Sequence, residues 1–228
     1  MNSAIIVAAG IGVRMGAEVD KLFLTVAGAP VIAHTWRRFE SCAEIDDLIL
    51  VVRPGRENEF AALAGACGFR KPFRCVPGGR ERQDSVWQGL AALRPEAELV
   101  AIQDGARPCT PVALITATLA AARESGAAVA AQRVSDTIKE SAEGREISRH
   151  LDRQRLWAVQ TPQCFQVKVI RQALSVVRAQ GVSVTDDTAA CEFIGQPVRL
   201  VESPAPNPKV TVPSDLPYIE LLLSTVGA

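Results

Sequence analysis

A short apolar run followed by a glycine-containing loop opens the chain: residues 3–15 read SAIIVAAGIGVRM. The run from Ser3 to Ala8 is rich in β-branched residues and predicts a first strand. The glycines that follow let backbone amides approach a ligand closely. In an open parallel sheet, ligands bind at the carboxyl ends of the strands, where this loop would lie. An ordinary strand-to-helix turn is the alternative, but Arg14 and Lys21 close behind the loop favour a bound phosphate.

The loop matches neither common phosphate-binding motif. It lacks the Lys and Ser/Thr of a P-loop, and a dinucleotide fingerprint would need a third glycine where Met15 stands. The sequence therefore predicts a phosphate site of another type.

Beyond this loop, short apolar runs alternate with longer amphipathic segments, which is typical of βα units in a mostly parallel sheet. Further strands are predicted at residues 45–52, 99–102, 127–131, 158–160 and 198–202, and segment 209–212 is expected to complete the sheet. Helices are predicted at residues 31–39, 57–66, 86–93, 112–124, 167–179 and from 214 onward, with Asp84 or Ser85 as the N-cap of the third. The pattern predicts one α/β domain, a doubly wound mostly parallel sheet, over residues 1–228.

Composition excludes several classes of protein. The 228 residues carry 25 Lys+Arg and 25 Asp+Glu, so no net positive field attracts a nucleic acid. With 48% hydrophobic residues, the chain can bury a sizeable core. The six cysteines form no C-x-x-C pair, which disfavours a zinc cluster or a redox motif. There is neither a signal peptide nor a membrane-spanning stretch, so we expect a cytoplasmic protein with reduced thiols and no membrane partner.

The regular alternation stops between residues 132 and 156, where charged side chains crowd around Gly144. Segments 135–139 and 146–150 would pair across a Glu143–Gly144 turn. We therefore expect a β-hairpin arm that leaves the main domain, and the alternative is a mobile surface loop.

Two further features point to the same edge of the sheet. Asp104 directly follows a buried strand, so its carboxylate would face the ligand crevice and bind Mg²⁺, unless it only caps the following turn. Gly78 and Gly79 lead into a helix that starts with hydroxyl and amide donors near Ser85. Such a helix end binds anions or a base edge, although many ordinary helices also begin this way.

Together these segments resemble the 2-C-methyl-D-erythritol 4-phosphate cytidylyltransferase family over nearly the whole chain. Each matching segment is weak alone, but their order is specific. The segments are Ala8-Ala9-Gly10-x-Gly-x-Arg14-Met15, Lys21 before Phe23-Leu24, Gly78-Gly79-x-x-Arg82-x-x-Ser85-Val86, Asp104-x-Ala106-Arg107-Pro108, Asp136-Thr137-Ile138-Lys139, Asp152-Arg153-x-x-Leu156-Trp157, Thr161-Pro162-Gln163, Thr185-Asp186-Asp187 and Lys209-Val210-Thr211. The resemblance implies a Rossmann-like nucleotidyltransferase fold.

The resemblance also implies roles for individual residues. Arg14 and Lys21 would stabilise charge on the triphosphate of CTP, and Asp104 would coordinate the Mg²⁺ cofactor. The nucleotide would be bound by Ala8, Ala9, Gly10, Gly79, Arg82, Ser85 and Gly105. The sugar phosphate would be contacted or positioned by Arg107, Thr137, Arg153, Thr161, Thr185 and Lys209. Thr137 and Arg153 would come from the arm of the second subunit of a homodimer with exchanged arms. Arg153 and Lys209, which would aim the incoming phosphate, count with Arg14 and Lys21 as catalytic.

The implied reaction transfers CMP from CTP to 2-C-methyl-D-erythritol 4-phosphate and releases pyrophosphate. No Ser-His-Asp or Cys-His constellation is recognisable, and a reaction driven by positioning and charge needs none. Departures from the family pattern are Asp20 and Leu22 beside Lys21, Arg80 where an acid is common, and Gly105 where alanine is usual. The alternatives are a cytidylyltransferase for another polyol phosphate, such as ribitol 5-phosphate, and a non-catalytic nucleotide-binding protein of the same fold.

Overall fold

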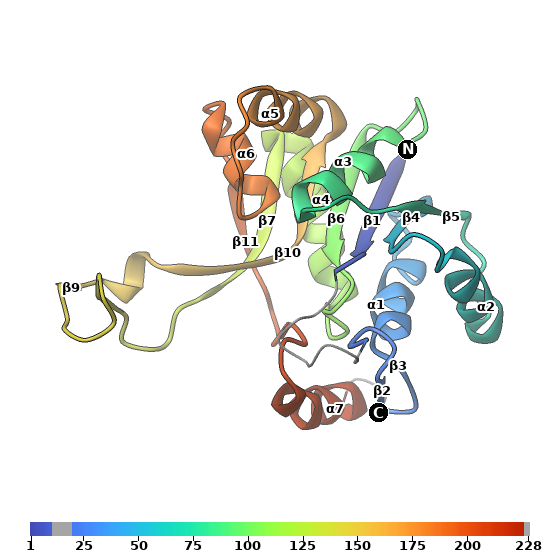
Figure 1. Cartoon of the computed structure of the whole chain (residues 1–228), viewed down its shortest axis with the longest axis horizontal. Helices are drawn as coiled ribbons and strands as arrows, with labels where there is room; N and C mark the ends of the chain where they lie inside the picture. Colours follow the sequence, from blue (N-terminus) through green and yellow to red (C-terminus); the bar gives the residue numbers. More distant parts are fainter. Residues whose placement is uncertain (11–19, 226–228) are drawn as a thin grey trace.

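A twisted seven-stranded sheet forms the centre of the molecule (Figure 1), in a computed structural model that describes residues 1–10 and 20–225. The strand order is β11-β7-β10-β6-β1-β4-β5. The strands are β1 (Asn2–Ala8), β4 (Asp47–Val52), β5 (Phe73–Pro77), β6 (Leu99–Asp104), β7 (Ala127–Arg133), β10 (Trp157–Gln166) and β11 (Arg199–Glu202). Every neighbouring pair is parallel except the two made by β10, which runs antiparallel to both β6 and β7. The predicted mostly parallel sheet is confirmed.

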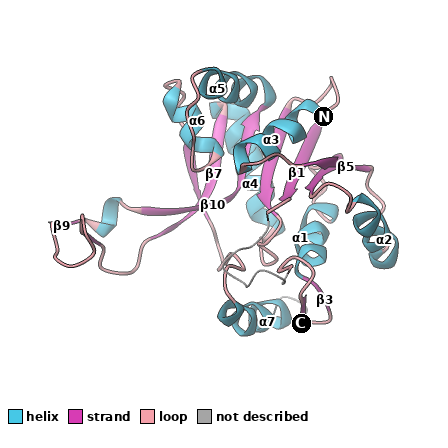
Figure 2. Cartoon of the chain, viewed as in Figure 1, coloured by secondary structure: helices cyan, strands magenta, loops and turns pink. Residues whose placement is uncertain are grey.

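Helices cover both faces of this sheet (Figure 2). One set comprises α1 (Val31–Glu40), α2 (Glu57–Cys67) and α4 (Val112–Ser125), while the terminal α7 (Leu216–Thr225) lies beyond the ends of the strands, beside β2 (Thr25–Val26). The other comprises α3 (Arg82–Ala91), α5 (Val167–Ala179) and α6 (Asp187–Phe193). None of the helices in the described part of the chain is long and apolar enough to cross a membrane.

The alternation of side chains along β1 explains why two cores form. Ile6 belongs to the core cluster that contains Trp36 of α1, whereas its neighbour Ile5 belongs to the cluster that contains Val86 of α3. All four side chains are fully buried. A central strand with helices on both sides must be apolar on both faces, which accounts for the uninterrupted apolar run near the N-terminus.

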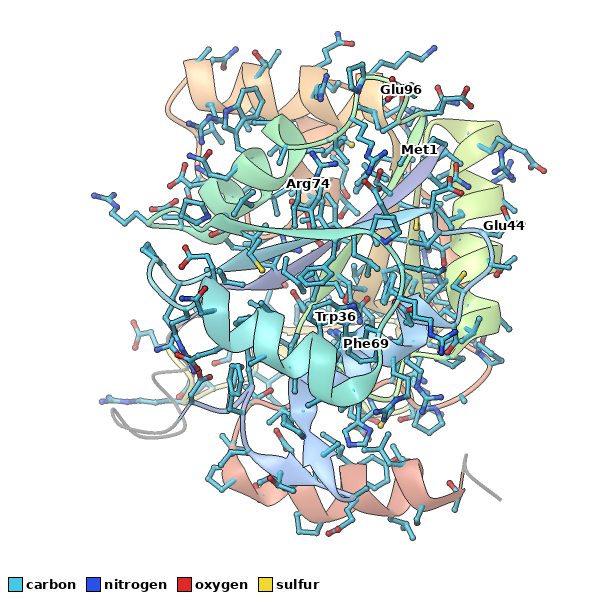
Figure 3. All side chains as sticks on the ribbon, turned by 90° about the vertical axis from the view of Figure 1, so that its right-hand side faces the viewer. Met1, Trp36, Glu44, Phe69, Arg74 and Glu96 are labelled. Atoms are coloured by element: carbon cyan, nitrogen blue, oxygen red, sulfur yellow. The ribbon has the colours of Figure 1, made fainter. Side chains whose placement is uncertain are left out.

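An aromatic cluster closes the first core beneath the edge of the sheet (Figure 3). The ring centroid of Trp36 lies 4.8 Å from that of Phe69 and 4.9 Å from that of Phe73. Phe73 lies on the edge strand β5, which was not among the predicted strands. Its residues are half-buried and it ends in a proline, as edge strands tolerate, so it lacks the periodicity of a buried strand.

Other expectations need correction. Helix α3 begins earlier than predicted, with Glu81 as the N-cap and Asp84 as its capping-box partner. Segment 209–212 forms no strand, because its backbone bonds to the loop after β6 instead, with Val210 N donating to Ala106 O at 2.8 Å. Strand β10 is longer than residues 158–160, since its polar residues find partners in β6 and β7. The structure also adds α6 and the short hairpin of β2 (Thr25–Val26) and β3 (Ala29–Pro30).

The charged segment after β7 projects from the body of the protein as an arm (Figure 1). At its tip, β8 (Lys139–Glu140) pairs with β9 (Arg149–His150), with Lys139 opposite His150. A β-hairpin is therefore present, but its strands are shorter and its loop longer than the expected pairing of 135–139 with 146–150.

Candidate active site

A cleft opens at the carboxyl ends of β1, β4, β5 and β6. Strand order reverses here: β1 is followed in the sheet by β4 on one side and β6 on the other, and such switch points open a crevice. The cavity measures about 790 Å³. Nine of the residues named from the sequence line it: Ala9, Gly10, Lys21, Gly79, Arg82, Ser85, Asp104, Gly105 and Lys209. We call this cavity the crevice.

Close backbone approach shapes one end of the crevice. A Cβ on Gly78 would lie 2.3 Å from the Cβ of Ala9, so only glycine allows these two loops to touch. Ser85 is buried, and its hydroxyl accepts a hydrogen bond from Gly79 N at 3.1 Å and donates to Glu81 O at 3.2 Å. Ser85 thus holds the glycine loop in place from the first turn of α3. Ala8 is buried at the end of β1 behind these loops.

Asp104 lies at the centre of a cluster of cations. Its Oδ2 is 2.8 Å from Lys209 Nζ and 3.5 Å from Arg107 Nε, and its Oδ1 is 3.5 Å from Arg82 Nε. Burial alone would raise the pKa of Asp104, but these positive charges outweigh it and hold that pKa well below the usual carboxyl range. Asp104 is therefore a permanently charged carboxylate at the floor of the crevice.

Arg82 reaches a second carboxylate that the sequence analysis did not single out. Its Nη1 donates to Asp187 Oδ2 at 2.8 Å. Burial opposes the charge of Arg82, but Asp187 and Asp104 together raise its pKa. Asp187 lies in the segment Thr185-Asp186-Asp187, from which only Thr185 was expected to matter. Thr185 is exposed and does not line the crevice as described.

A buried polar network supports the floor from behind. Thr161 Oγ1 accepts a hydrogen bond from Asp104 N at 3.1 Å, and Thr161 O accepts one from Asn207 Nδ2 at 2.8 Å. Arg107 Nη1 donates to Asn207 O at 2.7 Å. Thr161 and Arg107 are therefore placed behind Asp104 rather than on the crevice wall. Asn207, which links them two residues before Lys209, was not predicted.

The lysine expected to face the triphosphate lies at the mouth of the crevice. Lys21 Nζ donates to Val210 O at 2.9 Å, which ties it to the segment that carries Lys209. The unusual Asp20 beside it forms ion pairs with Arg53 and Arg56. Its charge is thus compensated by two arginines that follow β4. Arg14 lies outside the described residues.

Two other departures from the family pattern, Gly105 and Arg80, can be described by their contacts with neighbouring residues. A Cβ on Gly105 would lie 3.0 Å from Val7 O and 3.0 Å from Ile32 Cδ1, so an alanine here would require its neighbours to shift slightly. Arg80 is almost fully exposed at the rim of the crevice and pairs with Glu81 at 3.7 Å.

The arm residues do not meet the crevice within one chain. Thr137 and Arg153 are exposed and line a small cavity of about 300 Å³ on the arm itself. Arg153 Nη1 donates to Ser135 O at 2.6 Å. The arm that contains residues 137 and 153 projects away from the body of the molecule (Figure 1).

The carboxylate of Asp104 suits one kind of metal site. Within the described ranges, no cluster of three or more His, Cys, Asp or Glu side chains is positioned to hold an ion. Mg²⁺ often takes a single protein carboxylate and fills its other positions with phosphate oxygens and water. A charged, crevice-facing Asp104 beside cations that attract phosphate fits a metal delivered with a nucleotide.

Comparisons with known proteins agree with this geometry. The family model for 2-C-methyl-D-erythritol 4-phosphate cytidylyltransferase matches residues 2–225. A protein of that name from Pelotomaculum thermopropionicum is 40% identical over 222 residues, which cover 97% of this chain and 93% of the relative. One from Geobacillus kaustophilus is 41% identical over 222 residues, with 97% and 96% covered.

Solved structures point the same way. The crystal structure of 4-diphosphocytidyl-2C-methyl-D-erythritol synthase from Anaerococcus prevotii superposes with a TM-score of 0.87 at 31% identity, covering 98% of this chain and 96% of that one. A 2-C-methyl-D-erythritol 4-phosphate cytidylyltransferase from Thermus thermophilus gives a TM-score of 0.79 at 30% identity, with 98% and 100% covered. The chain belongs to the 2-C-methyl-D-erythritol 4-phosphate cytidylyltransferase family, nucleotidyltransferases of isoprenoid precursor biosynthesis.

Proposed function

We propose that this chain transfers the cytidylyl group of CTP to 2-C-methyl-D-erythritol 4-phosphate, with Mg²⁺ as the divalent cation and pyrophosphate as the second product. The observation that carries the proposal is the crevice, in which one charged carboxylate, Asp104, lies among Lys209, Arg82 and Arg107. A triphosphate needs this combination of cations and a metal ligand.

In the proposed reaction, a phosphate oxygen of the methylerythritol substrate attacks the α-phosphorus of CTP. The bond from that phosphorus to the oxygen bridging to the β-phosphorus breaks, and its electron pair leaves with pyrophosphate. Lys21 and Arg14 would stabilise charge on the triphosphate, while Lys209 would orient the attacking phosphate. Mg²⁺, when bound, would neutralise further phosphate charge at Asp104.

No residue has to remove a proton, since the attacking phosphate oxygen is already anionic. His34 is buried, and its Nε2 lies 2.8 Å from Val26 O. Burial lowers the pKa of His34, so it is a neutral structural side chain. His150 lies on the arm beside Lys139.

The small loops of Ala9, Gly10 and Gly79 would surround the cytosine, with Gly105 nearby. The buried hydroxyl of Ser85 orders the Gly79 loop, and these small loops would leave room for a pyrimidine. A purine should fit this end of the crevice poorly.

We propose that the working enzyme is a homodimer in which each arm reaches the partner's crevice. This proposal is supported by the exposure of Thr137 and Arg153 and by the projection of the arm from its own body (Figure 1). The exchanged arm would place these residues on the acceptor phosphate. Thr185, exposed beside α6, would contact the same substrate. We further propose that residues 1–228 act as a single nucleotidyltransferase domain in the cytoplasm.

The test is pyrophosphate release from CTP and Mg²⁺ with a panel of polyol phosphates. We expect the methylerythritol phosphate to give the highest kcat/KM and ATP or GTP to replace CTP poorly. A preference for ribitol 5-phosphate would assign the chain to the alternative acceptor. Failure with every acceptor, while CTP still binds, would identify a non-catalytic nucleotide-binding protein.

A further inference from the structure

Asp187 is the most deeply buried carboxylate near the crevice, and its role is not explained by substrate contact. Its side chain is about 1% exposed. Its Oδ2 accepts from Arg82 Nη1 at 2.8 Å, and its Oδ1 has no hydrogen-bond partner among the described residues. A buried carboxylate is costly unless a cation compensates it. Arg82 is therefore the group with which Asp187 acts.

The backbone around Asp187 holds it rigidly. Asp187 N donates to Gln163 Oε1 at 3.1 Å, and Gln163 Nε2 donates to Asp186 Oδ2 at 3.0 Å. Asp186 also caps α6, since its Oδ1 accepts from Ala189 N at 2.9 Å. The start of α6 is thus fixed to β10, and the carboxylate of Asp187 has a fixed position relative to the sheet.

Arg82 connects this fixed point to the floor of the crevice. It is the first residue of α3, lines the crevice and directs Nε toward Asp104 Oδ1 at 3.5 Å. A guanidinium is a planar fork, so anchoring one nitrogen at Asp187 determines where the others point. Without that anchor, Arg82 would turn more of its donors to Asp104, the nearest remaining carboxylate.

We propose that Asp187 is a positioning residue for nucleotidyl transfer: it restricts Arg82 to one long hydrogen bond with Asp104, from Nε to Oδ1 at 3.5 Å, and so limits how far Arg82 competes with the divalent cation for that carboxylate. The inference rests on the proposed function. It assigns a task to a residue of α6 that need not touch either substrate.

The primary test is Asp187→Asn, which keeps the shape of the side chain but removes its charge. We expect the Mg²⁺ concentration for half-maximal turnover and the Kd for CTP, measured by calorimetry with Mg²⁺ present, to rise about tenfold. Glu192→Gln removes an exposed charge from the same helix and should change neither value. Thermal unfolding and near-UV circular dichroism would show how much of each variant is folded, and the calorimetric Kd reports the folded fraction only.

A double-mutant cycle separates positioning from general structural support. Arg82→Lys keeps a cation but cannot bridge two carboxylates. If Asp187 acts through Arg82, adding Asp187→Asn to Arg82→Lys should change the Mg²⁺ requirement less than about threefold. Effects that simply multiply, or an Asp187→Asn variant with unchanged Mg²⁺ and CTP dependence, would overturn the proposal. Wild-type turnover in the same assay tests the proposed function separately, because its absence would refute that function while the CTP binding data still decide the role of Asp187.

Discussion

The crevice and the arm are built in opposite ways. Asp104 is buried, and cations and Thr161 contact it from several elements, so its geometry is set by the fold of one chain. Arg153, by contrast, is exposed and donates a hydrogen bond to a backbone carbonyl of the same arm. A part of a site that the fold already holds in place can bind its ligand unaided. A part whose side chains are not held in place needs a second surface to fix them. Under the proposed function, the crevice that would hold the nucleotide is of the first kind, and the arm's contribution to the acceptor site is of the second.

The largest loss of activity is expected when the charge at the centre of the crevice is removed. Asp104→Asn should lower kcat/KM at least about 100-fold, because it removes a charge around which the crevice is organised. Steady-state kinetics at several Mg²⁺ concentrations would measure the loss, with Glu143→Gln, an exposed position on the arm, as the charge control. Unchanged activity at limiting Mg²⁺ would mean that Asp104 only caps a turn.

The same variant has a defined pH signature. The pKa of Asp104 lies below its unfolded value, so its ion pairs contribute stability that is fully present above about pH 4 and is lost as the pH falls further. The difference in unfolding free energy between the wild type and Asp104→Asn should therefore stay constant from about pH 5 to about pH 8 and shrink toward acid. Urea unfolding across this range would measure it.

Substitutions on the arm should lower activity for a different reason. Arg153→Ala should lower turnover about 10- to 100-fold by removing a charged contact to the acceptor, whereas Arg145→Ala, elsewhere on the arm, should not. If the arms are exchanged, mixing Arg153→Ala with Lys209→Ala should restore activity, because a heterodimer rebuilds one intact site. Random mixing makes about half of the dimers heterodimers, and each heterodimer has one intact site out of two. About a quarter of the wild-type activity should therefore return.

Subunit exchange in that experiment must be confirmed by mass. Mixed dimers that remain as inactive as either single variant would show that Arg153 serves its own chain, and the contrast between the crevice and the arm would then need another explanation.

Backbone contact in the crevice gives an effect of intermediate size. Gly78→Ala would push a Cβ to 2.3 Å from that of Ala9, so we expect a loss of about 1–3 kcal/mol in the free energy of unfolding and weaker CTP binding. Gly105→Ala meets neighbours at 3.0 Å and should cost less. Chemical denaturation and calorimetry would compare them, and an equal cost for both would contradict the close packing of the two loops.

The smallest effect is expected at Asp20, at the partly exposed edge of the crevice. Its ion pairs with Arg53 and Arg56 are accessible to water, so Asp20→Asn should cost no more than about 1 kcal/mol of stability. For the same reason, Asp20→Asn should change the KM for CTP by less than about threefold. A larger change in KM would show that Asp20 controls Lys21 directly.

Sequence reasoning succeeded where a signal was local. The apolar run of β1, the loop after it and the carboxylate that ends β6 are each visible in a few consecutive residues. Their convergence follows from the rule that parallel strands present their carboxyl ends to one edge. The fold class, the crevice and Asp104 were predictable for this reason.

It failed where the partner is distant along the chain. The ion pair of Arg82 and Asp187 joins residues 105 positions apart, and nothing near either one indicates the other. Asn207 was missed for the same reason, since its contacts with Thr161 and Arg107 exist only in the folded sheet. Edge strand β5 lacked a buried pattern, so its pairing with β4 was decided by tertiary contact.

The root of the arm has an evolutionary consequence. Arg133 ends β7 opposite Trp157, which begins β10, and the Arg133 guanidinium lies 4.4 Å from the centroid of the Trp157 ring. The chain thus leaves the sheet at Arg133 and re-enters it at Trp157, and these two residues face each other. Insertions or deletions between them leave the register of the sheet unchanged. Relatives could therefore differ in the length of the arm while the strands that carry the crevice keep their register.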